Sequence, residues 1–379
     1  MARLLVCVQL GLLVLGLGLS GCGDSKSTAP AAASTNAVAS VGPAMSYDQA
    51  LALVRERIPA TNYFTNELLP KAGEPPPSAP KRESLKISMP WVFNDEIAPW
   101  YLAQEKKWFD QVGLDVELVP GGPGIDALQL LVANKVDIGV PTGASFVLHL
   151  RNSPTGSDVI AIAAIQKNAP ISWIGLDTSI PKNQRSTHKA TIKDLLGKRV
   201  GMQPGNDFYL EFALERSGYR KDAVQFMQAG YTPDPLLAGV MDFYFGWVNN
   251  QPRLIEQAGY SNWFALPCYE VGVDEYCDVS VVRRETLEKR PDVIRRYLWA
   301  LYQGTAFIID HPEEAAAITA RRSTDVSLTP AQVMRRFEIQ KNLMIGNDQQ
   351  PLLHMSAERW NSLAAGMVQF RQIEVAKAK

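Results

Sequence analysis

The chain has 379 residues, of which 46% are hydrophobic and 20% charged, so it can bury a large core or two lobes. Its 38 Lys and Arg almost balance 39 Asp and Glu, which leaves a formal net charge of −1 with both signs scattered along the sequence. This balance argues against nucleic acid as a partner, and beyond the N-terminus no apolar stretch approaches membrane-spanning length.

The first 21 residues are typical of a secretory signal peptide, with Arg3 followed by an apolar run over residues 4–19. That run is too short for a transmembrane helix, which needs roughly 20 apolar residues. The segment Leu19-Ser20-Gly21-Cys22 resembles a bacterial lipobox, in which Cys22 becomes the lipidated first residue. The alternative is an ordinary cleaved signal in which Cys22 is incidental. We expect a cell-envelope protein held by a lipid anchor and facing the periplasm or the exterior.

Residues 22–45 are rich in Ala, Ser, Thr and Pro and are expected to form a flexible tether. Within residues 46–82, apolar side chains recur at helical spacing over 46–70, and a Pro-rich linker follows. The sequence assigns no function to this helix.

From residue 83 the sequence alternates between strand and helix patterns. One helix is expected to contain Pro99 near its start and to run to Gly113. Short strands between helices are typical of α/β units with parallel sheets. After Arg283 only helices are expected. The remaining predicted strands cover 85–89, 114–118, 136–140, 159–165, 198–203, 223–227 and 240–245, and the remaining helices cover 125–134, 191–196 and 207–217.

Several segments resemble the substrate-binding proteins that serve nitrate, sulfonate and thiamine-precursor ABC importers. The longest runs over residues 98–118 and reads APWYLAQEKKWFDQVGLDVEL. The others are Gly121-Gly122 with Asp126-Ala127, ANKVDIG at 133–139 and DLLGKRVG at 194–201. Together they cover about 83–310, in the family's order.

The resemblance implies a type II periplasmic-binding-protein fold, with two α/β lobes, hinge strands and a helical C-terminal region. One lobe would comprise residues 83–176 and a return over 273–379, and the other residues 177–272. Ligands of open α/β sheets bind beyond the carboxyl ends of strands, so the solute would lie between the lobes and drive their closure. The implied partners are a small-molecule solute and an ABC importer permease, with a monomeric binding protein and no cofactor.

Two loops of the first lobe should face this cleft. Trp91 follows the first strand and suits stacking on a planar ring, although it could equally pack the rim. Asn94 is a weaker candidate because it could cap the next helix. Thr142 and Gly143 follow the third strand, where a helix N-terminus can hold an oxygen-rich group, with simple capping by Thr142 as the alternative.

Two loops of the second lobe should face the two loops of the first lobe across the cleft. Asn206 and Tyr209 are the candidates after strand 198–203, and Trp247 and Asn250 are those after strand 240–245. Tyr244, Glu270 and Trp173 are further ligand-binding candidates. Tyr244 could equally be a core residue. Glu270 and Trp173 each fall near an expected crossing between lobes, and the alternative for Glu270 is a solvated loop charge.

The titratable residues argue against an enzyme. Cys268 and Cys277 are either a local disulfide or two buried thiols, and no CxxC, HExxH, GxSxG or Walker motif accompanies them. No metal site is predicted. The four histidines are scattered, at His149, His188, His311 and His354.

The aromatic loops favour a flat heteroaromatic solute, such as a thiamine pyrimidine precursor or a riboflavin-like molecule. The alternative within the same family is a nitrate, alkanesulfonate or taurine binder. A pyrimidine-synthase-like enzyme and a sensor or chaperone-like lipoprotein are the remaining hypotheses.

Overall fold

The computed structural model describes residues 45–152, 158–325, 328–370, 373 and 375. The expected signal peptide, Cys22 and nearly all of the tether therefore lie outside the described residues. The described part belongs to one compact unit spanning residues 43–379. None of its helices combines the length and the apolar character needed to cross a membrane.

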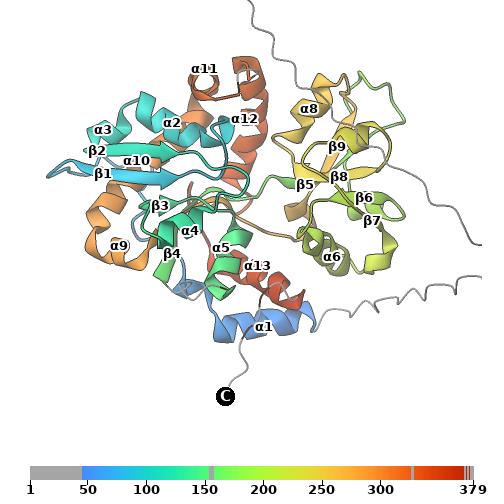
Figure 1. The fold of residues 1–379 in the computed structure, drawn as a ribbon, viewed down its shortest axis with the longest axis horizontal. Helices are drawn as coiled ribbons and strands as arrows, with labels where there is room; N and C mark the ends of the chain where they lie inside the picture. The colour runs from blue at the N-terminus through green and yellow to red at the C-terminus, as the bar shows by residue number, and fades with distance from the viewer. Residues whose placement is uncertain (1–44, 153–157, 326–327, 371–372, 374, 376–379) are drawn as a thin grey trace, which may run out of the picture. The chain divides into compact units, whose positions relative to one another are not determined.

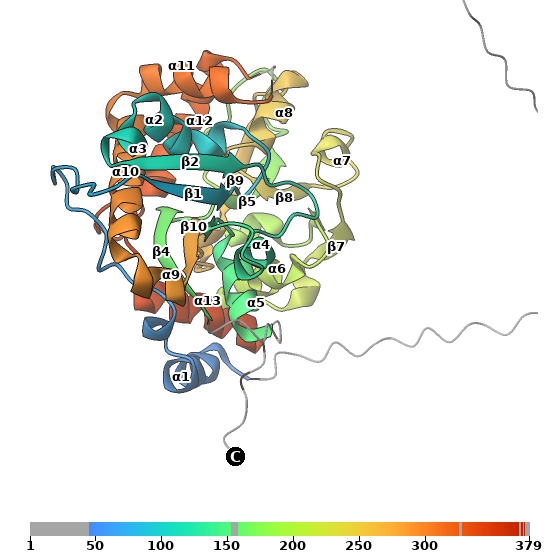
Figure 2. The ribbon, with the colours of Figure 1, turned by 60° about the vertical axis from the view of Figure 1, so that its left-hand side comes forward.

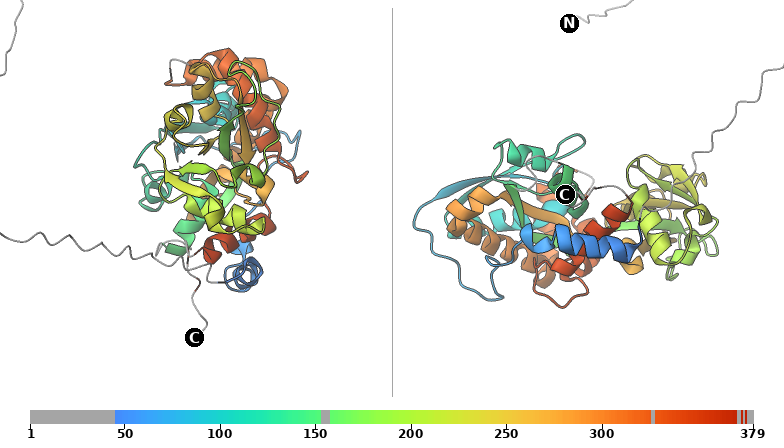
Figure 3. Two further views of the ribbon diagram at one scale, coloured as in Figure 1. Left: turned by 90° about the vertical axis from the view of Figure 1, so that its right-hand side faces the viewer. Right: turned by 90° about the horizontal axis from the view of Figure 1, so that it is seen from below.

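The first described element is helix α1, Tyr47–Arg57, which Ser46 and Gln49 begin with a capping box. Ala50 and Val54 are fully buried, and α1 packs on the C-terminal helix α13, Ala357–Gln369 (Figure 3). The helix expected within 46–70 therefore forms over its first half. A 3₁₀ turn follows, η1, Ala60–Asn62.

The chain next covers the edge of a sheet. The Thr65 N–H donates to the Ala161 carbonyl at 3.0 Å, and Phe64 forms a parallel bridge with Ala161. This pairing shields the outer strand, which would otherwise expose unpaired backbone groups.

The first sheet has the strand order β2-β1-β3-β10-β4, with β10 labelled in Figure 2 and the other strands in Figure 1. Strands β1, β2 and β3 are parallel, whereas β10 runs antiparallel to β3 and β4. The carboxyl ends of β1 to β4 and the start of β10 consequently lie at one edge. The strands are β1 Glu83–Ser88, β2 Leu114–Val119, β3 Ile138–Gly139, β4 Val159–Gln166 and β10 Cys277–Arg283.

Helices cover this sheet on both faces (Figures 1 and 2). The helix expected to reach Gly113 is instead interrupted, because Lys107 adopts a left-handed conformation with φ of 59°. The pieces are α2 Ala98–Glu105 and α3 Trp108–Gln111, preceded by the 3₁₀ turn η2 Asp95–Ile97. The other helices are α4 Ala127–Val132, α5 Gly143–Asn152, α9 Arg284–Lys289, α10 Pro291–Asp310, α11 Pro312–Arg322 and α12 Pro330–Ile345.

The second sheet has the order β7-β6-β8-β5-β9, with β6, β7 and β8 parallel and β5 antiparallel to its neighbours. Its strands are β5 Ile171–Leu176, β6 Arg199–Met202, β7 Gln225–Gln228, β8 Phe243–Trp247 and β9 Trp263–Pro267. Its helices are η4 Ile192–Leu195, α6 Asp207–Arg216, η5 Lys221–Ala223, α7 Asp234–Leu237, α8 Gln251–Gln257 and η6 Cys268–Val271.

The α/β class and the purely helical C-terminal region agree with the sequence. The second sheet begins at Ile171, however, so the first connection between sheets precedes residue 176, the boundary that we expected. Strands β5, β9 and β10 were not predicted. Strands β5 and β10 are buried almost throughout, so they lack the apolar–polar alternation that identifies a half-exposed strand.

Two chain segments join the sheets, residues 167–170 and 268–276. They run side by side, because the Ala169 N–H donates to the Glu275 carbonyl at 2.9 Å. A contact between two helices also links the sheets, because Gly366 of α13 packs against the Phe212 ring of α6. The second sheet is thus held by the connecting segments and by a C-terminal helix.

Candidate functional site

Turns that follow strands of the two sheets contact the connecting segments 167–170 and 268–276. The Gly143 N–H, at the start of α5, donates to the Tyr276 carbonyl at 2.9 Å. On the other side the Val248 N–H, after β8, donates to the Pro170 carbonyl at 2.8 Å. Strand-to-helix turns from both sheets are therefore fixed to the same pair of segments, and the region between them is the candidate cleft.

Glu275 is at the centre of this arrangement. Its Oε1 accepts the Ala144 N–H at 2.8 Å, and its Oε2 accepts the Tyr209 hydroxyl at 2.5 Å. The residue is 2% exposed, and burial raises the pKa of its carboxyl despite these hydrogen bonds. One side chain thus fills the N-terminus of α5 and ties it to α6 of the second sheet.

A second acidic group lies at the edge of the first sheet, where Glu96 hydrogen-bonds Asp278. Burial raises the pKa of Asp278 to about 6, and it raises the pKa of Glu96 well above its usual range. The Gln166 amide donates to Asp278 at 2.8 Å. Two carboxyl groups in contact cannot both ionise easily, so the pair holds a proton near neutral pH.

Cys277 completes this group, with its Sγ 3.7 Å from an Asp278 carboxylate oxygen. The donor atoms of Glu96, Cys277 and Asp278 lie within 4.8 Å of one another, so these three could approach a metal ion together. Three donors are fewer than the six to eight oxygens that a hard cation such as Ca²⁺ prefers. Structural zinc sites take four ligands, usually Cys and His, and this group offers a single thiol.

The predicted residues of the first lobe have mixed roles. Trp91 follows β1 and is 40% exposed, so its ring is accessible to solvent. The Asn94 Oδ1 accepts the Glu96 N–H at 2.9 Å, so Asn94 is the helix cap that was its alternative role. The Thr142 hydroxyl likewise accepts the Ser145 N–H at 3.2 Å.

Gly143 is required by a close approach of the backbone. A Cβ at this position would lie 2.8 Å from the Tyr276 carbonyl oxygen, closer than any side chain tolerates. The glycine therefore lets α5 begin directly against the connecting segment.

In the second lobe, Tyr209 is buried and donates a hydrogen bond from its hydroxyl to Glu275. Asn206 precedes α6 and donates to Gln203 Oε1 at 3.3 Å. Tyr244 is fully buried and donates to the Gly230 carbonyl at 3.0 Å, so it is a core residue, the structural alternative considered for it. Trp247 is half-buried at the end of β8.

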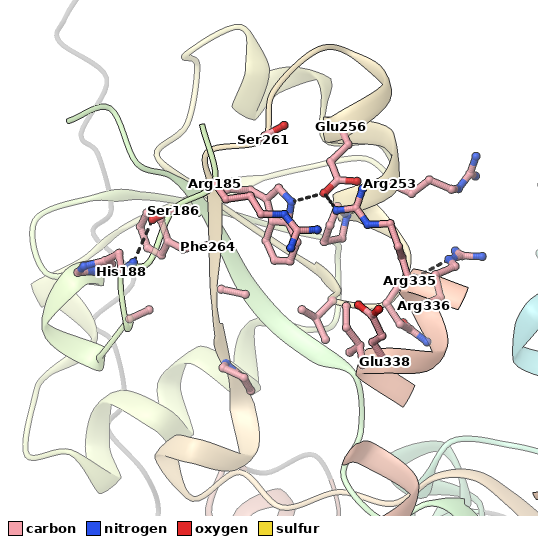
Figure 4. Close-up of a pocket in the computed structure, with 18 of the residues that line it drawn as sticks. Arg185, Ser186, His188, Arg253, Glu256, Ser261, Phe264, Arg335, Arg336 and Glu338 are labelled. Atoms are coloured by element: carbon pink, nitrogen blue, oxygen red, sulfur yellow. Dashed lines mark hydrogen bonds and ion pairs between the residues drawn. The ribbon is translucent and has the colours of Figure 1, made fainter. Parts of the chain in front are cut away.

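Glu270 is exposed and lines a cavity of about 830 Å³ beside β9, α8 and α12, together with Asn249 and Arg336. Figure 4 shows side chains that line this cavity. Cys268 and Cys277 are free buried thiols, and the Cys277 sulfur faces Asp278 instead of a second sulfur. Trp173 is fully buried in β5.

Sequence reasoning missed Glu96, Gln166, Glu275 and Asp278. Gln166 ends β4 and Asp278 lies in β10, where a local kink with φ of 53° accompanies it. A polar residue inside an apolar strand was the available signal, but recognising it required knowing that the two strands end at the same edge.

Comparison with known proteins places this geometry in context. A family model described as NMT1/THI5 like matches residues 94–315. A formylaminopyrimidine-binding protein of Halalkalibacterium halodurans is 21% identical over 74% of this chain and 83% of its own length. The riboflavin-binding protein RibY of Chloroflexus aurantiacus is 22% identical over 70% of this chain and 74% of its own.

An enzyme matches as well: a 4-amino-5-hydroxymethyl-2-methylpyrimidine phosphate synthase of Legionella pneumophila is 20% identical over 62% of this chain and 72% of its own. Among solved structures, the periplasmic aliphatic sulphonate binding protein SsuA from Escherichia coli gives a TM-score of 0.56 at 16% identity, covering 77% of this chain and 88% of SsuA. This likeness confirms the expected periplasmic-binding-protein fold.

Proposed function

The chain belongs to the NMT1/THI5-like family, and from this premise we propose that it captures a flat heteroaromatic solute between its two sheets. The solute would be a thiamine pyrimidine precursor or a riboflavin-like molecule. The observation that carries the proposal is Glu275, a carboxylate that already occupies the helix N-terminus where an anionic ligand would bind.

Helix N-termini attract anions because free N–H groups and the helix dipole converge there. In this chain the Ala144 N–H donates to Glu275, and Thr142 accepts from the N–H of Ser145. A sulfonate or nitrate would have to displace the Glu275 carboxylate and then lie beside it. This electrostatic conflict weighs against the anion-binding alternative.

The carboxyl pair Glu96–Asp278 favours a different ligand chemistry. A partly protonated pair both accepts and donates hydrogen bonds, which suits the adjacent amino and ring nitrogen atoms of a heteroaromatic ring. Trp91 and Trp247 supply aromatic faces at the ends of β1 and β8. Two of the relatives are named for binding heteroaromatic compounds, a formylaminopyrimidine and riboflavin.

The two buried thiols favour a binding protein over an enzyme with a cysteine nucleophile. Burial raises the pKa of Cys268 and of Cys277 well above the usual range, which keeps them protonated and poor nucleophiles. Burial also lowers the pKa of His149 and of His354. We place the protein in the cell envelope, anchored through Cys22 and delivering its solute to an ABC importer.

Native mass spectrometry of the freshly purified full chain tests the proposal, because closed binding proteins retain solute. We expect a retained heteroaromatic compound, and thermal stabilisation when the same compound is added back to stripped protein. Stabilisation by taurine or an alkanesulfonate, with none from pyrimidines or flavins, would replace the proposal by the anion-binding alternative.

A further inference from the structure

We infer that Arg336 is a positioning residue that locks the two ligand-facing turns of the proposed cleft to each other. One turn, residues 91–97, follows β1 of the first sheet, and the other, residues 247–250, follows β8 of the second. The role in ligand binding rests on the proposed function, whereas the lock itself is a property of the ligand-free protein.

The guanidinium of Arg336 contacts both turns. On one side it forms an ion pair with Asp95, whose second oxygen accepts the Gln340 amide at 3.0 Å. On the other side its Nε donates to the Asn249 carbonyl at 2.7 Å, and a terminal nitrogen donates to Asn250 Oδ1 at 2.5 Å. Every branch of the planar group is therefore engaged.

These bonds are protected from water. The Arg336 side chain is 7% exposed and that of Asp95 is 2% exposed. Removing one partner of such a pair would leave a buried charge unsatisfied, so the contact is costly to break. Separating the two sheets at this point would break all the bonds to residues 249 and 250 together.

The helix that carries Arg336 belongs to the first lobe. Val333 and Phe337 of α12 are buried in the same core as Leu85 and Ile87 of β1. Arg336 is thus anchored on one lobe and reaches across to the other. Its hydrogen bond to Asn250 Oδ1 also fixes the Asn250 side chain and thereby orients the NH₂ group of that amide.

A neighbouring ion pair provides the matched control. Arg335 lies next to Arg336 on α12 and pairs with Glu256 of α8 at 2.6 Å (Figure 4). Its side chain is 47% exposed, so solvent and salt screen the interaction. Both arginines connect α12 with the second lobe, and only the one at position 336 is buried.

The experiment compares the ligand-free full chain with Arg336→Met, Arg336→Lys and Arg335→Met. Small-angle X-ray scattering measures the radius of gyration, and hydrogen–deuterium exchange measures protection of residues 247–253. We expect both position-336 variants to show a larger radius and about tenfold faster exchange there, because neither side chain can bridge the two turns. Arg335→Met should match the wild type in both measurements.

Loss of Arg336 leaves Asp95 buried and without its cation, which could impair folding. The double variant Asp95→Asn with Arg336→Met removes both charges and keeps the test valid, and it should show the same opening. Wild-type scattering and exchange in both the single and double variants, even with a lower melting temperature, would reduce Arg336 to an ordinary stabilising residue and overturn the inference.

Measurements of solute binding distinguish a failure of this inference from a failure of the proposed function. Where the wild type binds a heteroaromatic solute, we expect Arg336→Met to bind it about tenfold more weakly, because the turns must then be ordered at binding. If the wild type binds no such solute, the proposed function fails, and the scattering and exchange data still decide the role of Arg336.

Discussion

The Tyr209 hydroxyl donates a 2.5 Å hydrogen bond to the Glu275 carboxylate, whose other oxygen accepts the N–H of Ala144. This chain of bonds joins α6 of one sheet to the N-terminus of α5 on the other. It has a direct chemical consequence, since a helix N-terminus that could attract an anion is occupied by the protein's own carboxyl group.

Replacing Glu275 with Ala should admit an anion. The variant frees the Ala144 N–H and removes the negative charge, so we expect weak binding of taurine, in the millimolar range, where the wild type shows none. Isothermal titration calorimetry measures it. Glu270→Ala, at an exposed position, is the control and should behave as the wild type. Equal taurine binding by wild type and Glu275→Ala would contradict the role given to this carboxylate.

The Asp278 carboxyl should make stability depend on pH in a defined direction. Its pKa is raised from 3.8 to about 6, so the folded chain keeps a proton that the unfolded chain loses. Its contribution to stability is therefore full below about pH 4 and is lost as the pH rises through about 6. The melting temperature of Asp278→Asn should show less of this decline, which thermal denaturation from pH 4 to pH 7 can measure. A difference between variant and wild type that is constant over this range would refute the assignment.

Trp91 should contribute to affinity and hardly to stability. Its side chain is 40% exposed, so Trp91→Ala should change the free energy of unfolding by no more than about 0.5 kcal/mol. Loss of a stacking ring costs about 0.5–1.5 kcal/mol, or roughly two- to twelvefold in affinity for a heteroaromatic solute. Phe226→Ala, which removes a similarly exposed ring from the edge strand β7, should leave affinity unchanged. Equal affinity losses for both variants would indicate a general structural effect.

Gly143 should resist substitution because of the connecting segment. An added Cβ would lie 2.8 Å from the Tyr276 carbonyl oxygen, so Gly143→Ala should destabilise the fold by about 1–3 kcal/mol. Gly230→Ala is the matched control, since a Cβ there meets nothing within 4 Å. Chemical denaturation of both variants measures the difference. Similar free energies of unfolding for the two variants would show that the backbone at the start of α5 can shift to accommodate a Cβ.

The sequence carries the architecture more clearly than the site. The strand patterns at 85–89 and 114–118 and the helix beginning near Pro99 depend on local periodicity, and the structure has elements at each of these positions. The break at Lys107 was hidden, because apolar residues continue at helical spacing on both sides of it.

The sequence indicates candidate site residues only where a residue follows closely on a strand. Trp91, Thr142 and Trp247 were chosen as candidates in this way, and they lie after β1, after β3 and at the end of β8. Glu275 and Asp278 depend on the crossing of distant segments, and no local pattern indicates which residues such a crossing brings together.

Calorimetric titration of the stripped full chain with an aminopyrimidine, riboflavin and taurine decides whether the protein binds a heteroaromatic solute or an anion. We expect saturable binding of one of the two heteroaromatic compounds at micromolar or lower concentration, and no heat from taurine. Saturable binding of taurine alone would contradict this expectation.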